Sequence, residues 1–302
     1  MKKITLLSIT VFACLFFSIQ TKAQQVFQLT QYMLNDFAYN PAIAGSADNF
    51  ITKVGFRKQW TGIEGAPTTV LLSGHGNFSQ KKSVGVGAML YSDKTGPTRR
   101  MGLNLAYAYH LPLNLEGNMH LGFGIGATVM QYAVNFDELN PAQSGDPGLG
   151  NSSENKLGAD ANLGIFLKGE SFSVGLSANQ LFASKFKFLG NAESIQNARH
   201  FYLSGNYNYD ISEKFGLQPG LLLKMVKGTN PQAEINLKGI YDKKYWLGLS
   251  YRTEDALAIL VGLQLPMGFN FAYSYDITTS GLNAVAGGTH ELSIGYNFNI
   301  FQ

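Results

Sequence analysis

The chain has 302 residues, few charges, and many glycine and aromatic side chains. Charged residues make up 14% of it, against about 25% in ordinary soluble domains, while glycine contributes 34 residues and aromatics 13%. This balance argues against a helical enzyme and favours a β-rich protein with much surface outside water.

Residues 1–23 have the features of a secretory signal peptide. Lys2 and Lys3 form a basic head, a mostly apolar run follows, and Ala23 ends the small-residue pattern that a signal peptidase reads. The alternative, a membrane anchor, is disfavoured because the apolar run is short and a processing site follows it. We therefore expect cleavage near Ala23, with Gln24 as the first mature residue.

The signal peptide also contains the single cysteine and part of the basic charge. Cys14 lacks the small residue two positions earlier that a lipoprotein would need. A mature chain without cysteine excludes disulfides and thiolate catalysis. Three of the 23 Lys and Arg residues lie in the signal, but none of the 20 Asp and Glu residues. The remainder is therefore balanced in charge, and we expect no nucleic-acid partner.

Residues 24–49 come before the regular pattern of the chain. Leu29, Tyr32, Met33 and Phe37 have the spacing of a short helix, which Asn40-Pro41 would end. We interpret 24–49 as a periplasmic segment that plugs the lumen of a barrel or docks on its inner rim.

From residue 50 onward, apolar and small or polar residues alternate with period two, which is typical of strands with two different faces. Most of the segments have about ten residues, the length that a tilted strand needs to cross a bilayer, whereas strands in soluble proteins more often have about five or six. The fourteen predicted strands are 50–60, 68–78, 83–92, 100–113, 119–135, 157–168, 172–182, 199–210, 215–227, 232–241, 245–252, 256–265, 269–278 and 289–301.

The connections between these strands differ on the two sides. A tight turn follows every even strand, whereas most odd strands are followed by longer loops, including 61–67, 92–98, 136–156, 183–198 and 279–288. Short turns on one rim and long loops on the other are typical of outer-membrane barrels, with the turns in the periplasm. An even number of strands returns both ends of the barrel to the periplasmic side.

These patterns predict an all-β fold: a transmembrane antiparallel up-and-down β-barrel of about 14 strands over 50–302, preceded by the signal peptide and the segment 24–49. Lipid cannot satisfy backbone hydrogen bonds, so only a helix or a closed sheet can span it. The predicted location is the cell outer membrane. A large soluble β-sandwich is the structural alternative. Aromatic residues at strand ends are expected in interfacial girdles: Trp60, Tyr109, Tyr132 and Trp246.

No motif predicts catalysis, and we expect no cofactor or metal. The chain has neither G-x-S-x-G nor H-E-x-x-H. The histidines lack metal-ligand spacing and are expected to be polar lumen or rim residues. They are His75, His110, His120, His200 and His290. An enzyme that uses Ser and His on the barrel wall remains an alternative.

Two further patterns have simple structural interpretations. Gly122, Gly124 and Gly126 alternate within a strand, where glycine lets the wall bend or lets something pack closely inside. A phosphate loop would need a strand-to-helix turn instead. The acidic residues Asp146, Glu154 and Asp160 could hold calcium, but they lack EF-hand spacing, so a solvated external loop is expected.

Three motifs follow the signal in order: Gln31-Tyr32-Met33, then Asn40-Pro41-Ala42-x-Ala44-Gly45-Ser46, then Arg57-x-Gln59-Trp60-x-Gly62-Ile63-x-Gly65-Ala66-Pro67-Thr68-Thr69. Together they resemble the PorP/SprF family, outer-membrane proteins of the type IX secretion and gliding machinery of Bacteroidetes. The resemblance is densest over residues 24–78.

The resemblance implies a non-enzymatic barrel in outer-membrane lipid. Its expected partners are a large secreted surface protein, often an adhesin, whose secretion or attachment it would assist, or periplasmic parts of the secretion and gliding machinery. The motif positions are expected to be structural or docking residues. They are Gln31, Tyr32, Met33, Asn40, Pro41, Ala42, Gly45, Arg57, Gln59, Trp60, Gly62, Gly65 and Pro67.

A passive channel for hydrophobic small molecules is the second functional hypothesis. Fatty-acid transporter barrels also have about fourteen strands, an N-terminal plug and an Asn-Pro-Ala signature, which Asn40-Pro41-Ala42 resembles. The motif from Arg57 to Thr69 favours the secretion component. Arg57 and Gln59 are expected to point inward, and Arg57 is expected to hold the N-terminal segment.

Overall fold

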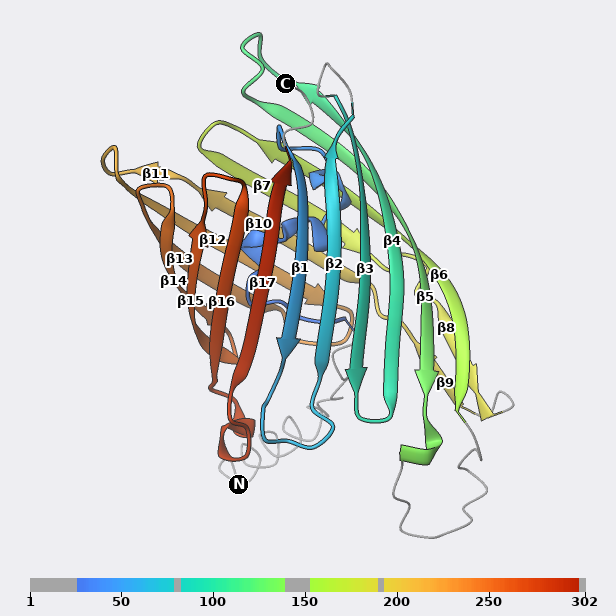
Figure 1. Ribbon diagram of the computed structural model, residues 1–302. Coiled ribbons are helices and arrows are strands. Elements are labelled where there is room, and N and C mark those ends of the chain that lie inside the picture. The colour runs from blue at the N-terminus through green and yellow to red at the C-terminus, as the bar shows by residue number, and fades with distance from the viewer. Residues whose placement is uncertain (1–25, 79–82, 139–152, 190–192, 299–302) are drawn as a thin grey trace, which may run out of the picture.

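The computed structural model describes residues 26–78, 83–138, 153–189 and 193–298, which form a closed antiparallel β-barrel (Figure 1). Its strands are β1 (Phe50–Lys58), β2 (Thr68–Asn77), β3 (Val84–Thr95), β4 (Thr98–Pro112), β5 (His120–Val134), β6 (Glu154–Lys168), β7 (Phe172–Asn179), β10 (His200–Tyr207), β11 (Tyr209–Asp210), β12 (Phe215–Val226), β13 (Gln232–Tyr241), β14 (Tyr245–Arg252), β15 (Ala256–Gln264), β16 (Phe269–Thr278) and β17 (Thr289–Phe298).

The barrel has fourteen strands around its wall, as the sequence predicted. The two residues of β11 continue β10, and both pieces pair with β12, so they count as one strand. Each strand pairs with its neighbour along the chain, and β1 pairs with β17 to close the sheet. A closed barrel excludes the soluble sandwich. Within the described part of the chain there is no helix with the length and hydropathy of a membrane span.

The two faces of the wall differ as the alternation predicts. In β16, Phe271 and Tyr273 are about two-fifths exposed on the outside, while Ser274 and Asp276 are buried inside. The outer face therefore offers apolar surface to lipid, and the inner face provides hydrogen-bonding groups.

Only part of the predicted aromatic girdle faces outward. Tyr109 is exposed on the outer face, whereas Trp246 lies inside, with the Nζ of Lys238 5.5 Å from its ring centroid. Tyr132 also faces inward and contacts Phe186. The prediction was wrong for Trp246 and Tyr132 because a position at a strand end does not determine the face. The alternation along the strand does.

Two connections differ from the predicted loops. β3 and β4 extend to Thr95 and Thr98, so the expected loop over 92–98 is a tight turn. The expected loop 183–198 contains a small hairpin of β8 (Lys185–Phe188) and β9 (Glu193–Gln196). Phe186 and Phe188 form a small apolar cluster with Met130. Alternating Lys and Phe over four residues gave too short a pattern to predict this hairpin.

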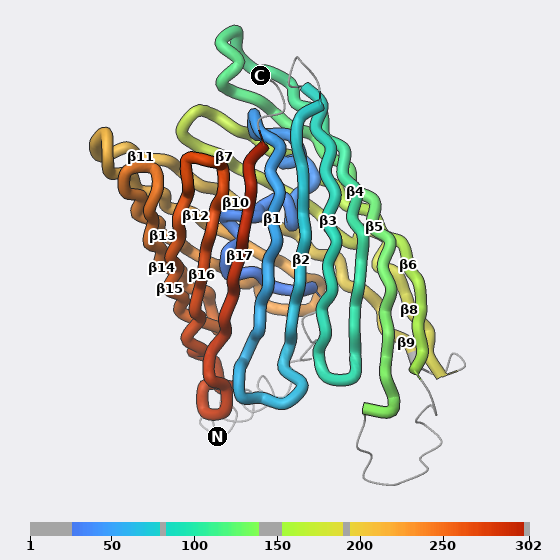
Figure 2. The backbone as a smooth tube through the Cα atoms, viewed as in Figure 1, coloured from blue at the N-terminus to red at the C-terminus, as the bar shows by residue number. Residues whose placement is uncertain are grey.

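Residues 26–49, called the inner segment below, lie within the barrel. Figure 2 shows them as a blue tube enclosed by the strands. In place of the single short helix expected, they form three 3-10 turns: η1 (Tyr32–Leu34), η2 (Asp36–Ala38) and η3 (Pro41–Ile43). Asn35 and Asn40 interrupt the helical path with non-helical backbone dihedrals, and Asn40 is extended.

The inner segment runs along the lumen from the long-loop rim to the short-turn rim. Phe27 contacts Tyr91 near the end of β3, and Gly45 lies against Gly85 at the start of the same strand. The first described residue is therefore at the opposite end of the lumen from the start of β1.

Candidate functional site

The N-terminal half of the inner segment contacts a buried ionic network. Arg57 of β1 and Arg252 of β14 are each only 2% exposed. Nη2 of Arg57 lies 3.1 Å from Oδ2 of Asp276, and its Nη1 lies 2.8 Å from Oε2 of Glu291. Arg252 Nε lies 2.8 Å from Oε2 of Glu234. A buried charge is costly unless it is paired and hydrogen-bonded, so these five side chains stabilise one another only as a set.

Thr30 lies at the centre of this network. Its hydroxyl accepts hydrogen bonds from Arg57 Nη1 at 2.6 Å and from Arg252 Nη2 at 3.0 Å, and donates to Asp276 Oδ2 at 2.6 Å. The backbone N–H groups of Thr30 and Gln31 donate to the carboxylate of Glu291 at 2.7 and 3.1 Å. The wall charges therefore bind the inner segment through both its side chains and its backbone.

The first motif continues this contact. The amide of Gln31 donates to the carbonyl of Glu291 at 2.9 Å and accepts from the hydroxyl of Ser293 at 2.6 Å. The hydroxyl of Tyr32 accepts from the side-chain amide of Asn236. Burial and the charge of Glu234 raise the pKa of Tyr32 well above its ordinary value, so the phenol stays neutral.

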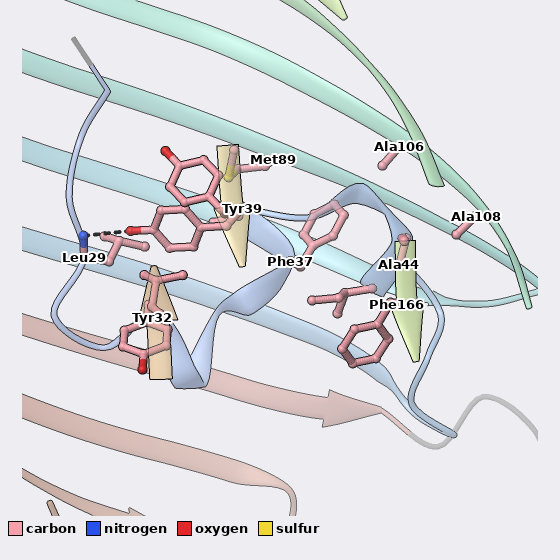
Figure 3. Close-up of a cluster of buried hydrophobic side chains, with 14 of the residues drawn as sticks. Leu29, Tyr32, Phe37, Tyr39, Ala44, Met89, Ala106, Ala108 and Phe166 are labelled. Atoms are coloured by element: carbon pink, nitrogen blue, oxygen red, sulfur yellow. Dashed lines mark hydrogen bonds between the residues drawn. The ribbon is translucent and has the colours of Figure 1, made fainter. Parts of the chain in front are cut away.

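The remaining residue of the first motif, Met33, is half-buried against the apolar side of the segment. That side forms the core of the barrel interior, where Leu29, Tyr32, Phe37, Tyr39 and Ala44 pack against Met89, Ala106, Ala108 and Phe166 (Figure 3). The hydroxyl of Tyr39 accepts a hydrogen bond from the N–H of Leu29 at 3.0 Å, which folds the segment back on itself.

The Asn-Pro-Ala motif fits against a glycine-lined part of the wall. The Asn40 side chain accepts from the N–H of Ala42 at 2.9 Å and donates to the carbonyl of Ile165 in β6 at 3.0 Å. Pro41 occupies the first position of η3, where its missing N–H is not needed. A Cβ on Gly124 would overlap the backbone of Ala42, and one on Gly164 would overlap the amide of Asn40. Of the two interpretations given to the mid-strand glycines, close packing inside the barrel is the one seen.

Gly45 ends the contact at the short-turn rim. It has a positive φ of 70°, and a Cβ there would overlap the backbone of Gly85. Its N–H lies 3.3 Å from Nδ1 of His75, and Nε2 of His110 lies 2.7 Å from the carbonyl of Ala44. These two lumen histidines therefore hold the inner segment, a role that their spacing in the sequence did not reveal.

The third motif divides between the lumen and the first loop. Gln59 is buried, as expected, and its N–H donates to the carbonyl of Pro67 at 2.9 Å, which closes that loop. The backbone of Trp60 has φ 48°, and its N–H donates to Thr289. Gly62 and Gly65 also have positive φ, and the carbonyl of Gly65 accepts from the N–H of Gly96. Trp60, Gly62, Gly65 and Pro67 thus shape the loop, while Arg57 bonds the inner segment.

Sequence reasoning missed the other four charged members of the buried ionic network around Arg57. Glu234, Arg252, Asp276 and Glu291 lie on four different strands far from the motifs. Each is a charged residue at a lumen-facing position of its strand, and that signal is visible in the sequence. Their mutual contacts depend on the closure of the barrel.

The calcium alternative considered for Asp146, Glu154 and Asp160 has no support from Glu154 and Asp160, the two members that lie in the described ranges. Asp146 lies outside the described residues. The carboxylate of Asp160 accepts from the N–H groups of Phe182 and Ser184, and that of Glu154 accepts from the N–H of Leu189. Both carboxylates fix the segment 182–189. Among the described ranges, no group of three His, Cys, Asp or Glu residues is arranged to hold a metal ion.

Cavities lie against the inner segment towards both rims. On the long-loop side, a space of about 60 Å³ is lined by residues that include Phe27, Asp93 and Asn104. On the short-turn side, about 360 Å³ is lined by residues that include Asp36 and Lys53. Burial raises the pKa of Asp36 above its ordinary value, and the charge of Lys53 partly opposes this.

Comparison with known proteins gives a family and a fold. A family model described as "Type IX secretion system membrane protein PorP/SprF" matches residues 21–296. No curated protein matches the sequence. The CymD monoaromatic hydrocarbon channel is similar in structure, with a TM-score of 0.53 at 11% identity over 94% of this chain and 96% of the other. The toluene transporter TodX of Pseudomonas putida has a TM-score of 0.49 at 9% identity, over 91% of this chain and 95% of the other. At these identities the likeness concerns the fold alone.

Proposed function

The chain belongs to the PorP/SprF family of type IX secretion system membrane proteins, and we propose that it is a non-enzymatic outer-membrane barrel that assists the secretion or surface attachment of a large secreted protein. That cargo would be adhesin-like, and the assembly would include periplasmic components of the secretion machinery and serve gliding motility. The motif residues that hold the inner segment have a structural role in this proposal, and no residue acts as a catalyst.

The position of the inner segment carries the proposal. Its polar side is bound to a buried ionic network and its apolar side packs in a core, so the lumen holds protein along its length. A barrel filled in this way offers its two rims to partners. The long-loop rim faces the cell exterior in the usual orientation of such barrels, and we assign cargo binding to it.

The channel hypothesis finds less support in the lumen. Passage of an apolar molecule needs an apolar route. The cavity on the long-loop side holds only about 60 Å³, and the inner segment separates it from the cavity at the other rim. An apolar solute would have to displace the segment and break its ionic contacts.

The test is a gentle-detergent pull-down of the tagged full-length protein from native outer membranes, with bound proteins identified by mass spectrometry. We expect a large secreted surface protein, periplasmic secretion components, or both. An untagged strain and an unrelated tagged barrel serve as controls. Recovery of the barrel without any protein partner would contradict the proposal, and a hydrophobic small molecule bound in its lumen would favour the channel.

A further inference from the structure

A row of basic side chains lies on the outer face of the barrel at the long-loop rim. Its members are Lys58, Lys94 and Arg99, and all three are exposed. Each is next in sequence to a residue whose side chain faces the lumen. Those inward neighbours are Arg57, Asp93 and Arg100. Because successive side chains on a strand point to opposite faces, the three basic side chains must point away from the lumen.

Strand register places the three cations at one level. Lys58 of β1 pairs with Thr68 of β2, Thr68 pairs with Lys94 of β3, and Lys94 pairs with Arg99 of β4. Neighbouring strands lie about 4.8 Å apart, so three positive charges fall within about 15 Å along four adjacent strands. Lys58 is also in register with His290 of β17. The row is therefore a compact feature of the wall rather than scattered surface charge.

This arrangement is unfavourable without an anion. Lys94 and Arg99 are directly opposite one another, and like charges in that position destabilise a sheet. Within the described ranges, one carboxylate bonds the row: Glu138 Oε1 lies 3.1 Å from the Nζ of Lys94. Both of these side chains are about half exposed, so the pair contributes little. The guanidinium Nε of Arg99 donates to the neutral hydroxyl of Ser92 at 3.2 Å. The row thus keeps an excess of positive charge.

Apolar side chains begin one step closer to the middle of the barrel. The next outward residues on β1, β2 and β4 are Phe56, Val70 and Met101, each more than two-fifths exposed. Such a band is in contact with lipid chains, and the residues at its edge lie at the level of the headgroups. The row therefore lies where an anionic headgroup meets the protein surface.

We propose that Lys58, Lys94 and Arg99 form a binding site for the phosphate groups of an outer-leaflet lipid. The headgroup phosphates neutralise the row and remove the repulsion between Lys94 and Arg99. The acyl chains of the same lipid lie along Phe56 and Val70. A soluble anion would gain the charge contacts but not the apolar ones, so the geometry favours a lipid. This inference rests on the barrel alone and does not depend on the secretion function.

The test measures binding of a phosphorylated lipid A to the full-length protein in neutral detergent, by native mass spectrometry or thermophoresis. The variant is Lys58→Gln with Lys94→Gln and Arg99→Gln. Each basic side chain near an anionic lipid contributes about 1 kcal/mol, or about fivefold, so we expect a loss of at least about tenfold. The matched control removes three exposed lysines at the other rim, with Lys214→Gln, Lys243→Gln and Lys244→Gln, and should bind as the wild type does.

Two comparisons identify the ligand chemistry. Dephosphorylated lipid A should bind the wild type about as weakly as the intact lipid binds the triple variant. Inorganic phosphate should not displace the intact lipid, because it lacks the acyl chains. Equal binding by wild type and triple variant, equal binding of the two lipids, or full displacement by inorganic phosphate would each overturn the proposal. Heat-modifiable mobility on gels checks that every variant is folded.

Discussion

The hydroxyl of Thr30 accepts a hydrogen bond from the guanidinium of Arg57 at 2.6 Å, across 27 positions of sequence. This contact joins the inner segment to β1, the strand that follows it. The same guanidinium also pairs with Asp276 and Glu291 on β16 and β17. The side chain of Arg57 therefore connects the first strand, the last two strands and the inner segment.

Replacement of Arg57 should loosen the inner segment. Arg57→Ala removes the hydrogen bond to Thr30 and leaves Asp276 and Glu291 without one of their cations. Breaking a buried ion pair costs about 3–5 kcal/mol. Limited proteolysis of the purified protein should then cut within residues 26–49 faster than in the wild type. Lys58→Gln, which changes the neighbouring outward residue, should leave the protection intact. Unchanged protection in Arg57→Ala would mean that Arg57 is merely a lumen charge.

A methyl group added to the barrel wall should also loosen the inner segment. Gly124→Ala places a Cβ against the backbone of Ala42, which cannot move without shifting η3. Overpacking of this kind costs about 1–3 kcal/mol. Gly55→Ala is the matched control, since no atom lies within 4 Å of the added Cβ. We expect a lower thermal midpoint and faster proteolysis for Gly124→Ala alone. Equal thermal midpoints and proteolysis rates in the two variants would show that the wall accommodates the added methyl group without strain.

Deletion of residues 24–49 should separate barrel formation from function. The strand pairings around the wall do not involve this segment, so the barrel should still fold and show heat-modifiable mobility on gels. Display of the cargo protein on the cell surface should be lost, as measured by protease shaving or antibody labelling of whole cells. Normal display by a folded deletion variant would show that the segment takes no part in cargo handling.

Protonation of Asp36 at acidic pH should stabilise the η2 turn of the inner segment inside the barrel. Burial raises the pKa of Asp36 above the ordinary 3.8. A group with a raised folded-state pKa contributes stability that is fully present below the unfolded pKa and is lost as pH rises through the folded one. The part of the proteolytic protection that Asp36 provides should therefore decline as pH increases upward from about 3.8, and it is measured as the difference between the wild type and Asp36→Asn. An equally steep profile in Asp36→Asn would assign the effect to other groups.

The strands could be predicted from sequence because each obeys a local rule. In Phe269–Thr278, alternation alone identifies the outer face. The same rule, applied residue by residue, would have placed Trp246 inside, between the outward Tyr245 and Leu247. The long-range contacts follow no local rule. Arg57 was expected to face inward and does, but its contact with Glu291 depends on the register between the first and last strands, which spacing along the chain does not encode.

The closing seam of the barrel has a consequence for assembly. Strands β1 and β17 form that seam, and Arg57 and Glu291 are partners in its register. The carboxylate of Glu291 also accepts hydrogen bonds from the backbone of Thr30 and Gln31. The inner segment extends through the filled lumen, so threading it in after closure would require its core contacts to form inside a finished wall. We therefore expect the segment to be enclosed as the last strand docks, so that the order of folding, rather than later diffusion, determines that it is inside.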